Sequence, residues 1–139
     1  MAKDLTGGCQ CRRIRYRVTV DNDDAYLCHC KMCRHATGGA SIAFVSVQLD
    51  KLVWETVPDW YRSSPIAERP FCRTCGTPLG FKFVEGATSM DITLGSFDDP
   101  HDFRPVTIMR PKAYCLPGRT RRTCRASARI RIPMSPIAG

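Results

Sequence analysis

Alternation of apolar and polar residues is the clearest structural signal in this chain. Residues 14–20 read Ile-Arg-Tyr-Arg-Val-Thr-Val, with an apolar side chain at every second position. A period of two predicts a β-strand with one buried face. The acidic run at residues 21–24 then predicts a turn, and residues 41–47 form a second β-type run.

Shorter apolar runs extend this pattern along the chain. They occupy residues 53–55, 60–62, 79–84 and 90–94, and residues 128–132 predict a short edge strand. Prolines that exclude long helices separate them: Pro58, Pro65, Pro70, Pro78 and Pro100. Many short strands at close spacing predict a mainly β, antiparallel domain.

Length and composition restrict the class of protein. A chain of 139 residues suits a single domain, and no stretch approaches the roughly 20 consecutive apolar residues of a membrane helix. With 43% hydrophobic and 24% charged residues, the composition is that of a folded protein. No apolar run follows the N-terminal residues, so we expect no signal peptide, no membrane anchor and a cytoplasmic location.

The formal net charge of +8 is concentrated at the C-terminus. Residues 1–109 contain thirteen basic and thirteen acidic residues, whereas residues 110–139 contain eight basic residues and no acidic one. A neutral body lacks the basic surface typical of nucleic-acid binding, so we expect no nucleic-acid partner. The sequence predicts a domain over residues 1–111 and a basic, divergent tail over residues 112–139.

Nine cysteines in a chain without an export signal point to metal binding rather than disulfides. Cys72 and Cys75, followed by Gly76, have the spacing of a zinc knuckle, in which a tight turn directs both sulfurs at one ion. Cys9 and Cys11 lie on the same side of an extended segment and would complete a closed, structural four-thiolate site. The alternative is that these cysteines are buried and inert.

Cys28, Cys30 and Cys33 form a group of a different kind. Three thiolates on one zinc leave a fourth position free, which is the pattern of catalytic zinc. That position would hold water or an incoming thiol as its thiolate. His29 is an alternative fourth ligand that would make the site structural, although neighbouring residues of an extended chain point to opposite sides.

These motifs resemble the glutathione-dependent formaldehyde-activating enzyme family, which also includes centromere protein V. The resemblance rests on residues 7–11 (Gly-Gly-Cys-Gln-Cys), residues 28–38 (Cys-His-Cys-Lys-Met-Cys-Arg-His-Ala-Thr-Gly), residues 69–76 (Arg-Pro-Phe-Cys-Arg-Thr-Cys-Gly) and residues 94–100 (Leu-Gly-Ser-Phe-Asp-Asp-Pro). It covers roughly residues 5–110, with all three cysteine motifs in order. The tail departs from the family pattern, because no tryptophan follows Trp60 and no acidic residue follows Asp102.

The resemblance implies a β-tent-like arrangement of short antiparallel sheets with two zinc ions per chain. One zinc would be structural, with the ligands Cys9, Cys11, Cys72 and Cys75. The other would be of the catalytic type, with the ligands Cys28, Cys30 and Cys33. It also implies a carbon–sulfur lyase of the S-(hydroxymethyl)glutathione synthase type, which adds glutathione to formaldehyde. Zinc-bound thiolate would be the nucleophile, and the partners would be a small thiol and an aldehyde.

Basic residues beside the cysteine groups are candidates for binding glutathione. Arg12 and Arg34, with Lys31, could hold its carboxylates, arginine in bidentate fashion. The alternative is that they are ordinary solvated charges. His35 is a candidate proton carrier or simply a surface histidine.

Two other functions remain open at this point. A non-catalytic zinc module would bind a protein or nucleic-acid partner, and a redox protein would use Cys72 and Cys75. No βαβ pattern surrounds that pair, so the redox interpretation is the weaker one. The fourth ligand of the zinc at Cys28, Cys30 and Cys33 distinguishes the enzyme from the binding module.

Overall fold

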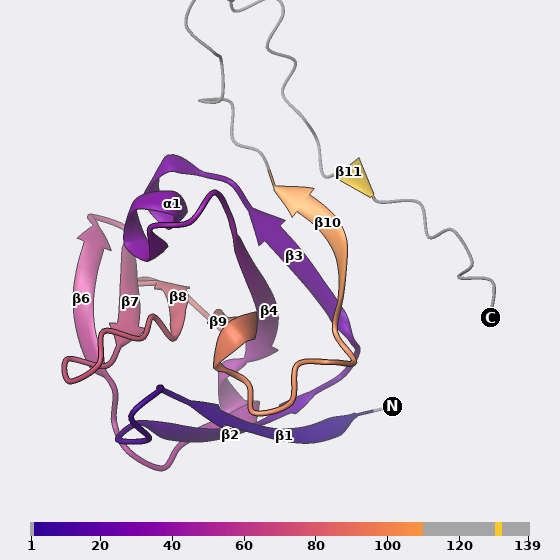
Figure 1. The fold of residues 1–139 in the computed structure, drawn as a ribbon, viewed down its shortest axis with the longest axis horizontal. Coiled ribbons are helices and arrows are strands. Elements are labelled where there is room, and N and C mark those ends of the chain that lie inside the picture. The colour runs from indigo at the N-terminus through magenta and orange to yellow at the C-terminus, as the bar shows by residue number, and fades with distance from the viewer. Residues whose placement is uncertain (1, 110–129, 132–139) are drawn as a thin grey trace, which may run out of the picture.

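The computed structural model describes residues 2–109 and 130–131, and β-strands predominate in them (Figure 1). A three-stranded sheet has the order β1-β2-β5, from β1 (Lys3–Gly8), β2 (Arg15–Val20) and β5 (Leu52–Trp54). An eight-stranded sheet has the order β11-β10-β3-β4-β9-β8-β7-β6. Its strands are β3 (Asp24–Cys28), β4 (Ile42–Gln48), β6 (Asp59–Ser64), β7 (Ala67–Phe71), β8 (Gly80–Phe83), β9 (Ser89–Thr93), β10 (Arg104–Met109) and β11 (Ile130–Arg131).

The mainly β fold predicted from the sequence is confirmed. The alternating apolar residues of the predicted strand are buried: Ile14, just before β2, and Tyr16 are 0% exposed, and Val18 is 3% exposed. Strands β4, β5, β6, β8 and β9 begin and end within about two residues of their predicted ranges. The predicted edge strand near residue 130 is also present, because β11 pairs with β10 at the edge of the larger sheet. The rest of the predicted tail, residues 112–129 and 132–139, lies outside the described residues.

One strand pair departs from the antiparallel pattern. Strand β10 runs parallel to β3, from the pair Arg104–Asp24 to the pair Met109–Cys28. A tight hairpin forces antiparallel pairing, but these two strands are joined through most of the domain, so their relative direction is not fixed locally. Strand β10 had no clear alternation in the sequence, nor did β1 or β7.

We expected the cysteine motif at residues 28–33 to be extended, but part of it is helical. Its last three residues belong to the helix α1 (Lys31–Thr37), with Cys30 as the extended N-cap residue. Gly38 ends the helix at φ 71°, in the left-handed conformation that glycine adopts freely, and donates its N–H to the Arg34 carbonyl. Two 3₁₀ turns, η1 (Leu49–Lys51) and η2 (Leu94–Ser96), are the other helical elements described. No helix in residues 2–109 is long and apolar enough to cross a membrane.

The main hydrophobic core joins the two sheets. Tyr16 lies at its centre, with edge-to-face ring contacts to Trp54 at 5.4 Å and Phe97 at 5.8 Å. Its hydroxyl shares a hydrogen bond of 2.8 Å with the Ser96 hydroxyl. Cys9 and Cys72 belong to the same core, whereas Cys28 and Cys33 pack with Phe44 in a smaller one. Each cysteine group is therefore anchored in its own part of the interior.

The close packing at Gly7 gives the first testable prediction. A Cβ atom there would lie 2.3 Å from the Tyr16 hydroxyl oxygen and 2.4 Å from the Ser96 carbonyl oxygen. We expect Gly7→Ala to lower the free energy of unfolding by about 1–3 kcal/mol, because overpacking forces the neighbours to move. Urea denaturation measures this, with Gly95→Ala as the control, since its Cβ would meet nothing within 4 Å. Equal urea midpoints for the two variants would contradict the prediction.

Candidate metal centres

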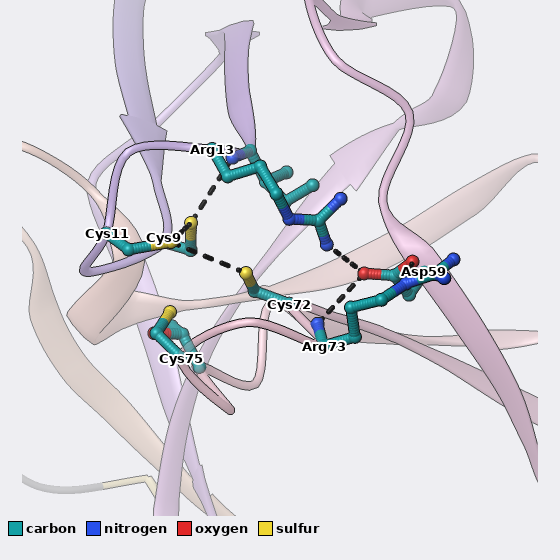
Figure 2. Close-up of polar contacts among 9 residues, drawn as sticks. Cys9, Cys11, Arg13, Asp59, Cys72, Arg73 and Cys75 are labelled. Atoms are coloured by element: carbon teal, nitrogen blue, oxygen red, sulfur yellow. Dashed lines mark hydrogen bonds and ion pairs between the residues drawn. The ribbon is translucent and has the colours of Figure 1, made fainter.

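Two turns bring four cysteines together (Figure 2). Cys9 and Cys11 lie in the turn between β1 and β2, and Cys72 and Cys75 lie in the turn between β7 and β8. All four Sγ atoms lie within 4.8 Å of one another, and the Cys11 and Cys72 sulfurs are 3.7 Å apart. The predicted pairing of the two cysteine motifs is therefore present, and four thiolates suit a tetrahedral zinc ion.

Each turn is closed by its own backbone hydrogen bonds. In the first turn, Cys9 donates its N–H to the Ile14 carbonyl at 3.1 Å, and Arg12 takes a positive φ of 65°. In the second, Gly76 donates to the Cys72 carbonyl at 2.7 Å and takes φ 76°, which glycine accepts without strain. The N–H of Gln10 reaches the Thr77 hydroxyl at 3.1 Å and joins the two turns.

The surroundings of the sulfurs act on their ionisation in both directions. Against a backbone hydrogen bond from Arg13, burial and the neighbouring cysteines raise the pKa of Cys11 to about 11. The N–H of Ile14 donates to the Cys9 sulfur at 3.2 Å. Hydrogen bonds from the hydroxyl and N–H of Thr77 are the main reason why the pKa of Cys75 falls to about 5. Because metal ligands must be deprotonated, these donors prepare the cluster for a cation.

A buried carboxylate connects both turns to β6. The Asp59 side chain is only 8% exposed and forms ion pairs with Arg13 and Arg73 (Figure 2). The Arg73 N–H donates to Asp59 at 2.9 Å and its Nε at 2.6 Å. These two bonds, followed by the guanidinium of Arg13, lower the pKa of Asp59 to about 2. Cys72 also helps to raise the pKa of Arg13, so Asp59 holds a residue that interacts electrostatically with a candidate ligand.

The second cysteine group lies where β3 meets α1. Cys28 is the last residue of β3, Cys30 caps α1, and Cys33 lies in the first turn of the helix. Their three sulfurs lie within 4.8 Å of one another. The Cys30 sulfur accepts the Cys33 N–H at 3.2 Å, so the same atom caps the helix and belongs to the cluster. His29 is not part of this group.

A buried arginine that sequence reasoning did not assign to this site contacts the three-cysteine group. Arg69 of β7 is 4% exposed, and its Nη2 donates to the Cys33 sulfur at 3.4 Å. Its guanidinium carbon lies 5.0 Å from the centre of the Phe81 ring. Arg69 appeared in the sequence only as the start of the Cys72 motif. No pattern in the sequence indicated that β7 is a strand. In this strand Arg69 lies on the same face as Ala67, which is buried.

Arg69 helps to set the protonation of Cys33. A hydrogen bond from Cys28, and then the Arg69 guanidinium, lower the pKa of Cys33 to about 5 against the effect of burial. The same Cys28–Cys33 hydrogen bond, together with burial, raises the pKa of Cys28.

The predicted glutathione-binding arginines do not line a common cavity. Arg12 is exposed and lines a cavity of about 390 Å³ beside Cys9, together with Asp98. Arg34 is half-buried on α1. Lys31 and His35 line a different cavity of about 400 Å³ between α1 and β6. The substrate-binding roles of Arg12 and Arg34 remain predictions.

Comparison with known proteins agrees with the resemblance seen in the sequence. Residues 4–115 match the family model described as glutathione-dependent formaldehyde-activating enzyme. An uncharacterized lyase of Schizosaccharomyces pombe is 32% identical over 83 residues, covering 60% of this chain and 61% of that protein. The chain thus spans less than two thirds of this relative.

The fold also has a counterpart among solved structures. A crystal structure of a Rhodobacter sphaeroides protein superimposes with a TM-score of 0.58. The match covers 68% of this chain and 88% of the other, at 21% sequence identity. At this identity the likeness extends to the fold alone.

The position of Asp59 behind the four-cysteine cluster gives a second prediction. Residues that support metal ligands typically change metal affinity 10–100-fold when replaced. We expect Asp59→Asn to weaken zinc binding at this cluster by about that factor, measured by competition with a chromophoric chelator. Asp21→Asn is the control, because Asp21 pairs only with the surface residue Lys51 in the described contacts.

The pH dependence of this effect has a definite sign. Because the pKa of Asp59 in the folded protein is about 2, below its ordinary value of 3.8, its contribution is complete above pH 4 and is lost as the pH falls towards 2. The difference in zinc affinity between wild type and Asp59→Asn should therefore stay constant between about pH 6 and pH 8. If the difference in zinc affinity changed across this pH range, a group other than Asp59 would be responsible for it.

Proposed function

The chain belongs to the glutathione-dependent formaldehyde-activating enzyme family, and on this basis we propose that it is a zinc-dependent carbon–sulfur lyase. Its reaction would join a small thiol to an aldehyde, with glutathione and formaldehyde giving S-hydroxymethylglutathione as the specific case. The lyase name of the Schizosaccharomyces pombe relative supports the reaction class.

The observation that carries this proposal is the three-sulfur group that has no fourth ligand among the described residues. Cys28, Cys30 and Cys33 present only soft thiol donors at mutual distances that suit one ion, and this donor set fits zinc. Within the described residues, no histidine or carboxylate joins them as a fourth ligand. A zinc ion held by three thiolates would keep one position for an incoming thiol and stabilise it as the thiolate near neutral pH.

The residues of this chain have defined tasks in that reaction. Arg69 donates to the Cys33 sulfur and so favours its thiolate, and Cys30 fixes the start of α1 through its cap. Burial of Cys28 and Cys33 keeps water from the inner side of the group. Addition of the thiol forms one carbon–sulfur bond and moves the thiol proton to the aldehyde oxygen. The overall step therefore needs no oxidant or reductant.

The four-cysteine cluster has a structural task in this proposal. Cys9, Cys11, Cys72 and Cys75 would fill all four positions of a zinc ion and leave none for a substrate. Such an ion would link the β1–β2 turn to the β7–β8 turn. Cys11 in the first turn and Cys72 in the second are 61 positions apart in the sequence. In a small domain, metal binding of this kind contributes directly to folding.

Two matched substitutions test this division of roles. Cys30→Ser should keep the fold and lose one of two zinc ions, because serine is itself a good N-cap residue and the helix stays capped. Thiol addition to formaldehyde, followed by NMR, should fall to the uncatalysed rate. Cys75→Ser should instead lose the other zinc and unfold the domain, visible by circular dichroism.

The result also separates the enzyme from a non-catalytic zinc module. Equal loss of structure in Cys30→Ser and Cys75→Ser would contradict the assignment of one structural and one catalytic cluster. Wild-type protein with two zinc ions and no acceleration of the addition would favour the binding module.

A further inference from the structure

Arg69 is a buried cation whose charge is not balanced by a carboxylate. Its guanidinium donates to the Cys33 sulfur at 3.4 Å and lies 5.0 Å from the centre of the Phe81 ring. Glu68, its acidic neighbour in β7, instead pairs with Lys82 at 2.9 Å. Within the described residues, no aspartate or glutamate forms an ion pair with Arg69. Because an uncompensated buried charge is costly, the cysteine group is the natural source of its counter-charge.

The carboxyl of Asp91 is a poor alternative counter-ion. Asp91 lies in β9 and pairs in register with Phe81 of β8, the strand beside β7. Burial, and to a smaller extent the charge of Cys33, raises the pKa of Asp91 above its ordinary value. A carboxyl that is shifted towards its neutral form offers less negative charge to a nearby cation.

The charges of the three-cysteine group and of Arg69 are complementary. Three thiolates around one Zn²⁺ ion have a single net negative charge, and the guanidinium of Arg69 cancels it. A thiolate in the fourth position would add a second negative charge. Net charge in a site shielded from water is costly, because the surroundings screen it weakly. Arg69 therefore lowers the cost of binding an anion in that position, whereas a neutral ligand gains far less from it.

Burial distinguishes Arg69 from the basic residues of α1. Lys31 and His35 are both exposed, so water and salt screen their charges. Arg69 is only 4% exposed, and its contact with a ligand sulfur and an aromatic ring fixes the guanidinium in place. Its charge is therefore felt at the cysteine group more strongly than that of Lys31 or His35.

We propose that Arg69 is the counter-charge that allows an anionic thiolate to occupy the fourth position of a zinc ion at Cys28, Cys30 and Cys33. This inference rests on the proposed function, because it requires that position to be open. A thiol binds there by releasing its proton to the solvent and forming a metal–sulfur bond, without any transfer of electrons. Arg69 acts through the sulfur cluster, so it is a positioning residue that favours thiolates over neutral ligands.

The test replaces zinc with cobalt(II), whose absorption spectrum responds to each sulfur ligand. The four-cysteine cluster would fill all positions of its own ion, so a spectral change on adding a ligand reports on the three-cysteine group. The probe for an anionic ligand is 2-mercaptoethanol, which binds as its thiolate. Imidazole is the neutral probe, and both are titrated without oxygen at one fixed pH.

Two substitutions separate the charge of Arg69 from its shape. Arg69→Met should weaken thiol binding at least about tenfold and leave imidazole binding within about twofold of wild type, because only the anion loses its counter-charge. Arg69→Lys keeps a cation without the planar guanidinium and should bind both ligands within about threefold of wild type. Arg17→Gln is the surface control with wild-type affinities, since Arg17 is exposed on the other sheet and pairs with Glu55.

Either of two results for Arg69→Met would overturn the proposal. Equal weakening of thiol and imidazole binding would mean that Arg69 shapes the site without acting through its charge. Thiol binding within twofold of wild type would mean that the anion needs no counter-charge. If circular dichroism shows that Arg69→Met does not fold, Arg69→Lys decides, because loss of thiol binding in a folded protein that keeps the cation contradicts the role of charge.

The same titrations distinguish failure of this inference from failure of the proposed function. A wild-type spectrum that changes with neither ligand would mean that the fourth position is closed, and would overturn both. Thiol binding by wild type that does not depend on Arg69 would overturn the inference alone. Thiol binding that depends on Arg69, in a zinc-loaded protein that does not accelerate addition to formaldehyde, would overturn the proposed function and leave the role of Arg69 in place.

Discussion

The approach of two cysteine turns is the contact on which the arrangement of the domain depends. It joins the β1–β2 turn of the smaller sheet to the β7–β8 turn of the larger one, and Cys9 and Cys72 are part of the main core. Hydrogen bonds from Thr77 favour the thiolate of Cys75, and thiolates repel one another unless a cation lies between them. A bound metal ion would therefore stabilise this contact. The ion pairs of Asp59 with Arg13 and Arg73 connect the two turns around it.

The β6–β7 hairpin connects the structural cluster with the proposed reaction site. Asp59 at the start of β6 and Cys72 just after β7 belong to the four-cysteine end, while Arg62 and Arg69 lie beside α1. The two strands therefore link the position of the four-cysteine cluster to that of the three-cysteine group. A buried arginine costs much free energy unless it is paired, so the contact of Arg69 with the Cys33 sulfur requires a cluster able to hold negative charge.

The alternation of apolar and polar residues predicted those strands that have one buried face and one exposed face. Residues 14–20 alternate because one face of β2 packs on the core, and the structure buries every apolar residue of that run. Strand β7 carried no such signal, because it contains Pro70 and buries the charged Arg69. Helix α1 escaped detection because seven residues are too few for a helical period, and its cap is a cysteine sulfur rather than a hydroxyl or carboxylate.

The sequence by itself determined the two cysteine groups and the mainly β class, because ligand spacing and strand alternation are local properties of the chain. Only the tertiary structure decided which basic residues meet the three-cysteine group. Arg12 follows a cysteine closely in sequence yet lines a cavity at the other cluster, whereas Arg69, 36 positions from Cys33, contacts its sulfur. Sheet pairing places Arg69 of β7 next to Cys33 of α1, and no local pattern records contacts made through the pairing of distant strands.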